Sequence, residues 1–170
     1  SIEVKDEQAN KWVKFEPFDG YKVKIITDFG GHPVFQKEYS TFEVDFAKHS
    51  YIEEISRART FGFMYEVELM RKNGLGLGGN LNNAIVLDED SVLNEGGLRF
   101  PDEFVRHKIL DAIGDLYIIG HQFIGAFSGY RSGHAINNQL LRKILVNKDS
   151  WDYVEFNDID EIPKSFSYVN

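Results

Sequence analysis

Residues 104–134, with the sequence FVRHKILDAIGDLYIIGHQFIGAFSGYRSGH, contain the most informative pattern in the chain. His107, Asp111 and Asp115 follow one another at steps of four, which on an α-helix places their side chains on the same face. The apolar positions that can bury another face of this helix are Ile109, Leu110, Ile113, Leu116, Tyr117 and Ile118. We therefore predict a long amphipathic helix with one polar stripe in this part of the chain.

The polar stripe has two interpretations. An imidazole nitrogen and a carboxylate oxygen one helical turn apart are suitable zinc ligands, and a carboxylate a further turn along can hold a neighbouring group in place. A histidine and an aspartate at this spacing are more often an ordinary solvated or hydrogen-bonded helix face. The stripe alone does not decide between a metal site and a solvated surface.

The composition limits the possible classes of protein. A chain of 170 residues is long enough to bury the core of one domain. A net charge of −8 argues against a nucleic-acid partner, and the absence of cysteine excludes disulfides and thiolate metal sites. The apolar runs are shorter than the ~20 residues that span a bilayer, and no signal-peptide pattern is present. We expect one monomeric, cytoplasmic domain without a transmembrane segment.

Side-chain periodicity predicts the fold class. Alternation or short apolar runs predict strands at residues 11–16, 21–29, 41–46, 122–127 and 151–156. Helical periodicity predicts helices at residues 49–59, 101–120 and 135–146. For the second of these, Pro101 is typical of a first helical position and Gly120 is typical of the residue that ends a helix. The turn residues at 17–20 suggest that the first two strands form a hairpin, whereas residues 1–10 carry no signal. The sum is an α+β fold, a two-layer sandwich of one β-sheet packed against two long helices.

Residues 61–88 differ from the rest by their density of glycine and predict a small β-α-β insert. Gly74, Gly76 and Gly79 match the spacing G-x-G-x-x-G. A dinucleotide fingerprint must follow a strand and open a helix, but here a helix precedes the glycines and a strand follows them. The residues by themselves favour a packed insert in which glycine permits close backbone approach.

Four segments together resemble the second, C-terminal domain of the zinc-dependent UDP-3-O-acyl-N-acetylglucosamine deacetylase family. They are ISRARTFGF (55–63), GLGLGGNLNNAIVLD (74–88), FVRHKILDAIGDLYIIGH (104–121) and GAFSGYRSGHAINNQLL (125–141). The likeness extends from about Lys11 to Phe156, so residues 1–170 are expected to form this single domain. It implies the same α+β fold and a role in hydrolysing the acetamide of an acylated UDP-sugar, a step in lipid A biosynthesis in Gram-negative bacteria.

The resemblance also implies roles for the polar residues. His107 and Asp111 match two zinc ligands of the family, whose third ligand and general base belong to a first domain that this sequence lacks. His134 matches a cationic histidine that protonates the leaving amine or stabilises the oxyanion. Asp115 matches the partner that favours the charged imidazole, and Thr60 matches a hydroxyl that hydrogen-bonds the tetrahedral intermediate.

The remaining matches concern substrate binding. Lys108 and Arg131 match positions near the sugar and the diphosphate. Lys108 is also expected to be one of the catalytic residues. Phe29 matches an aromatic residue that packs on the uracil, and Lys11 a lysine near phosphate. The expected passage for the acyl chain is lined by Phe61, Val67, Gly76, Gly79, Asn80, Ala84 and Val86.

Two functions therefore remain open. In the first, the chain supplies two zinc ligands, the histidine–aspartate pair and the acyl passage to a deacetylase. It then lacks useful turnover without the first domain, whether that domain was removed or is a separate chain. Alternatively, it is a non-catalytic module that binds an acylated UDP-sugar. Lys108 and Arg131 also have a simpler interpretation as ordinary surface charges.

Overall fold

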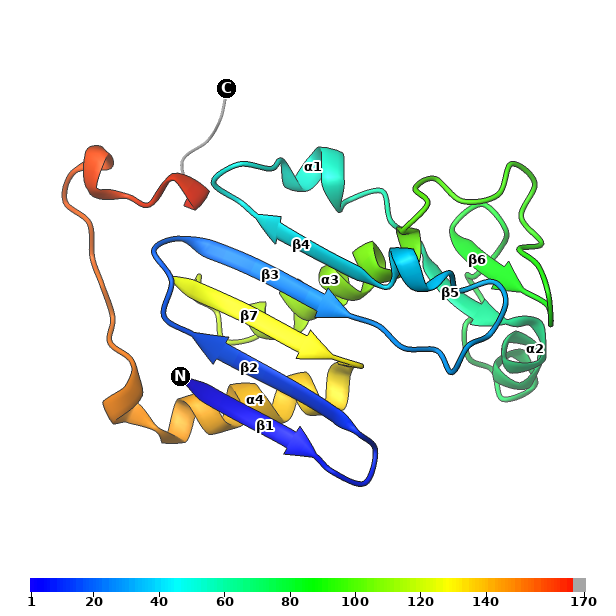
Figure 1. The fold of residues 1–170 in the computed structure, drawn as a ribbon, viewed down its shortest axis with the longest axis horizontal. Helices are drawn as coiled ribbons and strands as arrows, with labels where there is room; N and C mark the ends of the chain where they lie inside the picture. The colour runs from blue at the N-terminus through cyan, green and yellow to red at the C-terminus, as the bar shows by residue number, and fades with distance from the viewer. Residues whose placement is uncertain (167–170) are drawn as a thin grey trace.

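The computed structural model describes residues 1–166 and has a five-stranded mixed sheet with two long helices against one face (Figure 1). The sheet order is β1-β2-β7-β3-β4, with β1 (Ile2–Asp6), β2 (Lys11–Glu16), β3 (Tyr21–Ile26), β4 (Thr41–Asp45) and β7 (Gly125–Tyr130). The long helices are α3 (Glu103–Tyr117) and α4 (His134–Val146). The predicted α+β sandwich is confirmed.

A smaller unit lies beyond one end of this sheet (Figure 1). It consists of β5 (Thr60–Phe63), α2 (Met64–Lys72) and β6 (Ala84–Leu87), with β5 and β6 parallel. This is the predicted β-α-β insert. The short elements are α1 (Tyr51–Glu54) and the 3-10 turns η1 (Lys37–Tyr39), η2 (Lys148–Ser150), η3 (Ile159–Glu161) and η4 (Lys164–Phe166).

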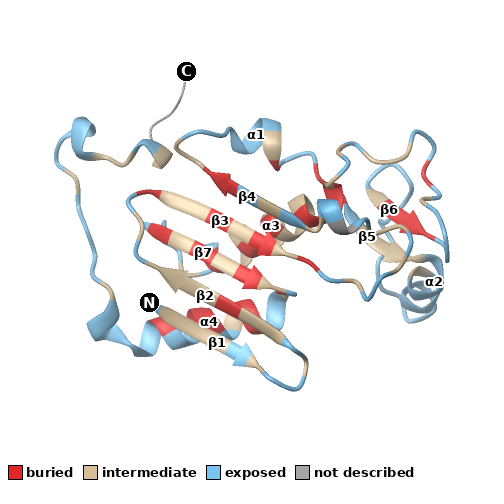
Figure 2. Cartoon of the chain, viewed as in Figure 1, coloured by how far each residue is buried: buried red, intermediate tan, exposed pale blue. Residues whose placement is uncertain are grey.

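Alternation along the strands divides the main sheet into a buried and a charged face. The fully or almost fully buried strand residues, which join the core with α3 and α4, are Val13, Val23, Ile25, Val44 and Phe127 (Figure 2). On the other face, charged residues of β2, β3 and β4 pair with one another, as Lys14 does with Glu16 at 2.6 Å. The charged face needs no covering layer, so both helices pack on the other face.

The predicted hairpin between β2 and β3 is wrong. β7 lies between these strands, antiparallel to β2 and parallel to β3. The hairpin partner of β2 is β1, in which Ile2 and Val4 pack against the core although residues 1–10 gave no signal. The strand predicted at 122–127 is also displaced, since β7 begins at Gly125 and places Phe127 and Gly129 on the buried face.

Several helix ends and one further strand also differ from the predictions. The helix expected at 49–59 contracts to the four residues of α1, in which Ile52 is 72% exposed, while Ile55, which follows α1, is buried. Helix α3 ends at Tyr117, three residues before the expected end at Gly120. Tyr117 and Ile118, which were expected to be buried, are exposed.

Residues 151–156 form no strand in the described structure. The Trp151 indole N–H donates to the carbonyl of Ile144 at 2.8 Å, which holds this segment against the end of α4 rather than beside a strand. Within residues 1–166, no helix has the length and apolar content required to cross a bilayer.

Candidate active site

Helix α3 presents the predicted polar stripe beside the segment that leads into β5. His107 and Asp111 are largely buried, with side-chain exposures of 13% and 16%, and Nε2 of His107 lies 3.3 Å from Oδ1 of Asp111. The other ring nitrogen, Nδ1, lies 3.2 Å from the carbonyl oxygen of Ala58. A carbonyl can only accept, so Nδ1 carries the proton and Nε2 is directed at the carboxylate.

This arrangement brings two electron-rich atoms together. In neutral His107, the Nε2 lone pair and the Asp111 carboxylate oxygen face each other, which is favourable only when a cation lies between them. That cation can be a proton or a metal ion. Burial alone would raise the pKa of Asp111, but the hydrogen bonds and positive charges of His107 and Lys108 hold it below its usual value.

Lys108 and Phe61 complete this part of the site. The ammonium of Lys108 lies 3.2 Å from Oδ2 of Asp111 and 5.9 Å from the centre of the Phe61 ring. The ring of His107 lies 6.3 Å from that of Phe61. Four residues predicted separately from the sequence are therefore neighbours, with an aromatic ring from β5 beside the polar stripe of α3.

Thr60 is the first residue of β5 and is exposed, two residues after the carbonyl that holds His107. Arg59, the last residue of the helix expected at 49–59, lies outside α1, is 8% exposed and is paired with Glu103 of α3 at 2.8 Å. The expected helix stops short of this point, and a buried guanidinium requires a carboxylate partner, which α3 supplies. The segment that carries Thr60 is thus attached to α3 at both Glu103 and His107.

The second half of the polar stripe meets α4. Nδ1 of His134, the first residue of α4, lies 2.9 Å from both carboxylate oxygens of Asp115. The side chain of His134 is 72% exposed and that of Asp115 is 15% exposed. Since the carboxylate accepts, Nδ1 carries the proton and Nε2 is available for proton exchange with a bound molecule.

The buried amide of Asn137 also contacts this pair, with Nδ2 donating to Oδ2 of Asp115 at 2.9 Å. Asn137 was not among the residues predicted from the sequence. A usable signal was present, because Asn137 follows His134 by three positions and stands directly after the buried Ile136.

The residues expected to line the acyl passage lie in the insert. Gly76, Gly79 and Asn80 are exposed, Phe61, Val67 and Ala84 are half-buried, and Val86 is buried. The guanidinium of Arg71 donates to the carbonyl of Gly79 at 3.1 Å. Asn94, which was also not predicted from the sequence, accepts from the backbone N–H of Val86 and donates to the carbonyls of Leu81 and Ala84.

The residues matched to the nucleotide gather at one end of the main sheet. Trp12 of β2 pairs with Tyr130 of β7, so Lys11 and Arg131, one residue beyond this pair, lie at the same end. Arg131 has a positive φ of 50° and donates its backbone N–H to the carbonyl of Ile26 at 2.8 Å. No measured contact joins Lys11 or Arg131 to the polar stripe of α3 within the described residues.

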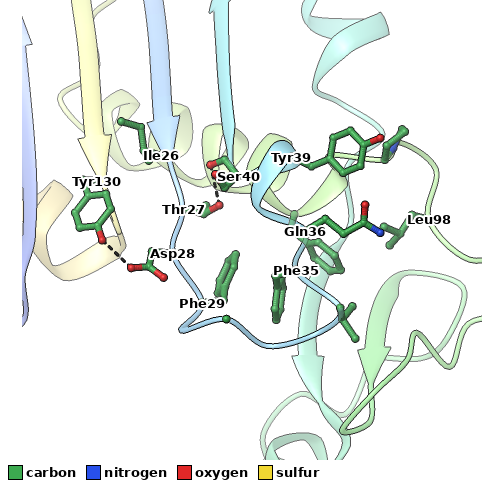
Figure 3. Close-up of a pocket in the computed structure, with 14 residues that line it drawn as sticks. Ile26, Thr27, Asp28, Phe29, Phe35, Gln36, Tyr39, Ser40, Leu98 and Tyr130 are labelled. Carbon is green, nitrogen blue, oxygen red and sulfur yellow. Dashed lines mark hydrogen bonds between the residues drawn. The ribbon is translucent and has the colours of Figure 1, made fainter.

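A cavity of about 450 Å³ opens at this end of β3, between the loop that follows it and the start of α3 (Figure 3). The rings of Phe29 and Phe35 are stacked in its wall with centroids 4.0 Å apart. The hydroxyl of Tyr130 donates to Oδ2 of Asp28 at 2.7 Å, and this hydrogen bond raises the pKa of Tyr130. An apolar cavity with a few polar groups at its wall is the usual form of a ligand site.

Residues 1–166 contain no cluster of three or more histidine, aspartate or glutamate side chains with the geometry to hold a metal ion. The pair formed by His107 and Asp111 suits a metal by its chemistry, with one nitrogen and one oxygen donor that face each other and a ring fixed through its other nitrogen. A complete zinc site would require a further ligand.

Comparisons with known proteins point to one family. A family profile described as "LpxC: UDP-3-O-acyl N-acetylglycosamine deacetylase" matches residues 1–146. The UDP-3-O-acyl-N-acetylglucosamine deacetylase of Neisseria meningitidis serogroup A is 63% identical over 169 residues, which cover 99% of this chain and 54% of the relative. The proteins of the same name from Neisseria gonorrhoeae and Chromobacterium violaceum are each 60% identical, covering 99% and 94% of this chain.

The chain spans about half the length of these curated relatives, since it covers 54%, 54% and 52% of them. The matched residues 1–146 include every residue predicted for the site, from Lys11 to His134. On the strength of this match, the chain belongs to the UDP-3-O-acyl N-acetylglycosamine deacetylase family.

Proposed function

We propose that this chain supplies one half of the active site of a deacetylase that hydrolyses the acetamide of UDP-3-O-acyl-N-acetylglucosamine, in the biosynthesis of lipid A of Gram-negative bacteria. Membership of the family and the names of the relatives support this activity. Because the chain spans about half of those relatives, turnover requires the remaining half as well. Its cytoplasmic location and monomeric state stay predictions.

His107 and Asp111 are the proposed ligands of a zinc ion, with the third protein ligand supplied from outside the described residues. The facing donor atoms, 3.3 Å apart, and the hydrogen bond from Nδ1 to Ala58 support this assignment. When bound, zinc supplies Lewis-acid chemistry that polarises the amide carbonyl and makes water more acidic. Lys108, 3.2 Å from Asp111, adds positive charge where the substrate carbonyl becomes negative.

His134 is the proposed general acid. Hydrolysis adds water across the amide, breaks the C–N bond and releases an amine that needs a proton. With Nδ1 held by Asp115, protonated His134 can deliver the proton on Nε2 to the amine nitrogen, and the carboxylate stabilises the imidazolium beforehand. The exposed hydroxyl of Thr60 can donate to the oxygen of the tetrahedral intermediate.

The two ends of the substrate are assigned to different parts of the chain. We place the acyl chain along the insert, where exposed apolar side chains accompany the glycine-rich loop, as with Leu75 and Leu77 at 60% and 72% exposure. The nucleotide end is placed near Lys11, Arg131 and Phe29, since cationic and aromatic groups there suit a diphosphate and a planar base.

The observation that carries the proposal is that one helix, α3, holds both the facing pair His107/Asp111 and the carboxylate that orients His134. The test is calorimetric titration of zinc into this chain, alone and fused to the part of the Neisseria meningitidis relative that it does not match. We expect weak binding to the chain, lost in His107→Ala, and much tighter binding with deacetylase activity in the fusion.

The matched control is His121→Ala, which removes an exposed histidine whose ring packs on Tyr153 away from the site. It should leave both zinc binding and activity unchanged. If zinc binds no better in the fusion and no activity appears, the catalytic proposal fails. Binding of an acylated UDP-sugar to the inactive fusion would then favour the non-catalytic module.

A further inference from the structure

The contacts of Asp115 do not end at His134. Asn137 lies one turn further along α4, and its side-chain N–H donates to the same Oδ2 atom that lies 2.9 Å from Nδ1 of His134. We propose that Asn137 is a positioning residue for the deacetylase reaction, which fixes the Asp115 carboxylate so that His134 presents Nε2 to the substrate. This inference rests on the proposed function, because it deepens the role of the same site.

Burial argues against a packing role for Asn137. The residue is 1% exposed, between the two helices, and its Oδ1 atom has no hydrogen-bond partner in the described structure. A buried oxygen without a donor destabilises the fold relative to an apolar group of similar shape. A leucine would fill the same space without this cost, so the amide at this position is explained by its contact with Asp115. Sites that break a local rule in this way are commonly functional.

The orientation of the amide follows from charge. If the oxygen and nitrogen of Asn137 were exchanged, its Oδ1 would face a carboxylate oxygen of Asp115 at 2.9 Å, and both atoms are acceptors. The N–H must therefore point to Asp115. As a result, the carboxylate is held by two residues of α4 and cannot rotate away from the exposed ring of His134 without losing the hydrogen bond from Asn137.

The test is Asn137→Leu, with two readouts. In the chain alone, nitrogen-15 NMR at a pH where imidazole is neutral reports which ring nitrogen of His134 is protonated, and His134→Gln assigns the signal. We expect the proton on Nδ1 in the parent and a mixture with the Nε2–H form in the variant. In the fusion with the unmatched part of the Neisseria meningitidis relative, kcat should fall about tenfold with KM unchanged.

The matched control is Asn138→Leu, which changes the neighbouring asparagine, whose Oδ1 accepts from Arg142 instead of contacting Asp115. It should keep the parent tautomer and kcat. Should Asn137→Leu not fold, Asn137→Ala removes the same donor without added volume, and the same two readouts apply to it.

The outcomes separate this inference from the proposed function. An unchanged tautomer and kcat in the folded Asn137 variant overturns the positioning role. The positioning role is also overturned if the loss of kcat in the variant equals the fraction of that variant that is unfolded. If the tautomer of His134 changes while the parent fusion has no deacetylase activity, the positioning of His134 is supported and the proposed function fails.

Discussion

The carboxylate of Glu103 lies 2.8 Å from Nε and 3.0 Å from Nη2 of Arg59, which makes a bidentate ion pair between α3 and the segment before β5. Glu103 is fully buried and also accepts from the backbone N–H groups of Arg59 and Arg99. This pair therefore sets the position of Thr60 relative to α3, and it connects the insert to the main sheet.

Removing one member of this pair should strongly destabilise the fold. Glu103→Leu leaves the guanidinium of Arg59 buried without its partner, and the free energy of unfolding should fall by about 3–5 kcal/mol in urea titrations. Glu43→Leu, which removes a carboxylate from the exposed ion pairs of the sheet, should change it by no more than about 0.5 kcal/mol. Similar small losses in both variants would contradict this account.

The same carboxylate should make stability depend on pH. Burial by itself raises the pKa of Glu103, but the hydrogen bonds from Arg59 and Arg99 outweigh it and hold the pKa below its ordinary value of 4.5. A carboxylate with a lowered pKa in the folded state stabilises the fold fully above its ordinary pKa, and this contribution is lost as the pH falls toward the folded value. Urea unfolding should thus show an acid-labile component below pH 4.5. That component should be smaller in Glu103→Leu.

Asn94 should control the stability of the insert. Its buried side chain accepts from Val86 at 2.9 Å and donates to the carbonyls of Leu81 and Ala84 at 2.7 Å each. Asn94→Ala leaves these backbone groups without partners, so local stability should fall by about 1–3 kcal/mol. Hydrogen exchange should become faster in β6, whereas Asn82→Ala, at an exposed position, should leave it unchanged. Equal exchange in both variants would show that Asn94 does not hold β6.

Two glycines should respond to alanine in opposite directions. Gly125 has a φ of +155°, and a Cβ there would collide with the ring of Phe15 and approach the carbonyl of Glu16. Gly125→Ala should therefore lower the melting temperature. Gly114, in the exposed part of α3, has open space around it, and Gly114→Ala should stabilise the protein by about 0.5–1 kcal/mol. A shift in the same direction for both variants would contradict the assigned backbone geometry.

The sequence predicted those elements whose signals are local. Helical periodicity located α4 to within one residue, and alternation located β2 at its observed ends. Strand partners depend on contacts far apart in the chain, which is why the hairpin between β2 and β3 was wrong. Residues 151–156 alternate as a strand would, yet Tyr153 and Val154 are 69% and 60% exposed. A segment with alternating residues forms a strand only where a neighbouring strand has free backbone groups to pair with it.

The site was predictable to a similar extent. A spacing of four places His107 beside Asp111, and this contact is seen in the structure. The link from Asp115 to His134 was expected only from the family resemblance, since the residues are 19 positions apart. The carbonyl of Ala58 could not be assigned, because its role comes from tertiary packing and not from a motif. Asn137 has the helical spacing from His134, but its contact with Asp115 depends on the packing of α4 against α3.

The central place of β7 has a consequence for how the protein is made. Phe15 pairs with Phe127, so β2 and β3 cannot be joined until the chain beyond residue 125 has been synthesised. Before then, β1-β2 and β3-β4 can form only as separate hairpins, each with an unpaired edge that could associate with another chain. The main sheet is complete only when β7 pairs with both β2 and β3, and contacts so distant in sequence generally form slowly.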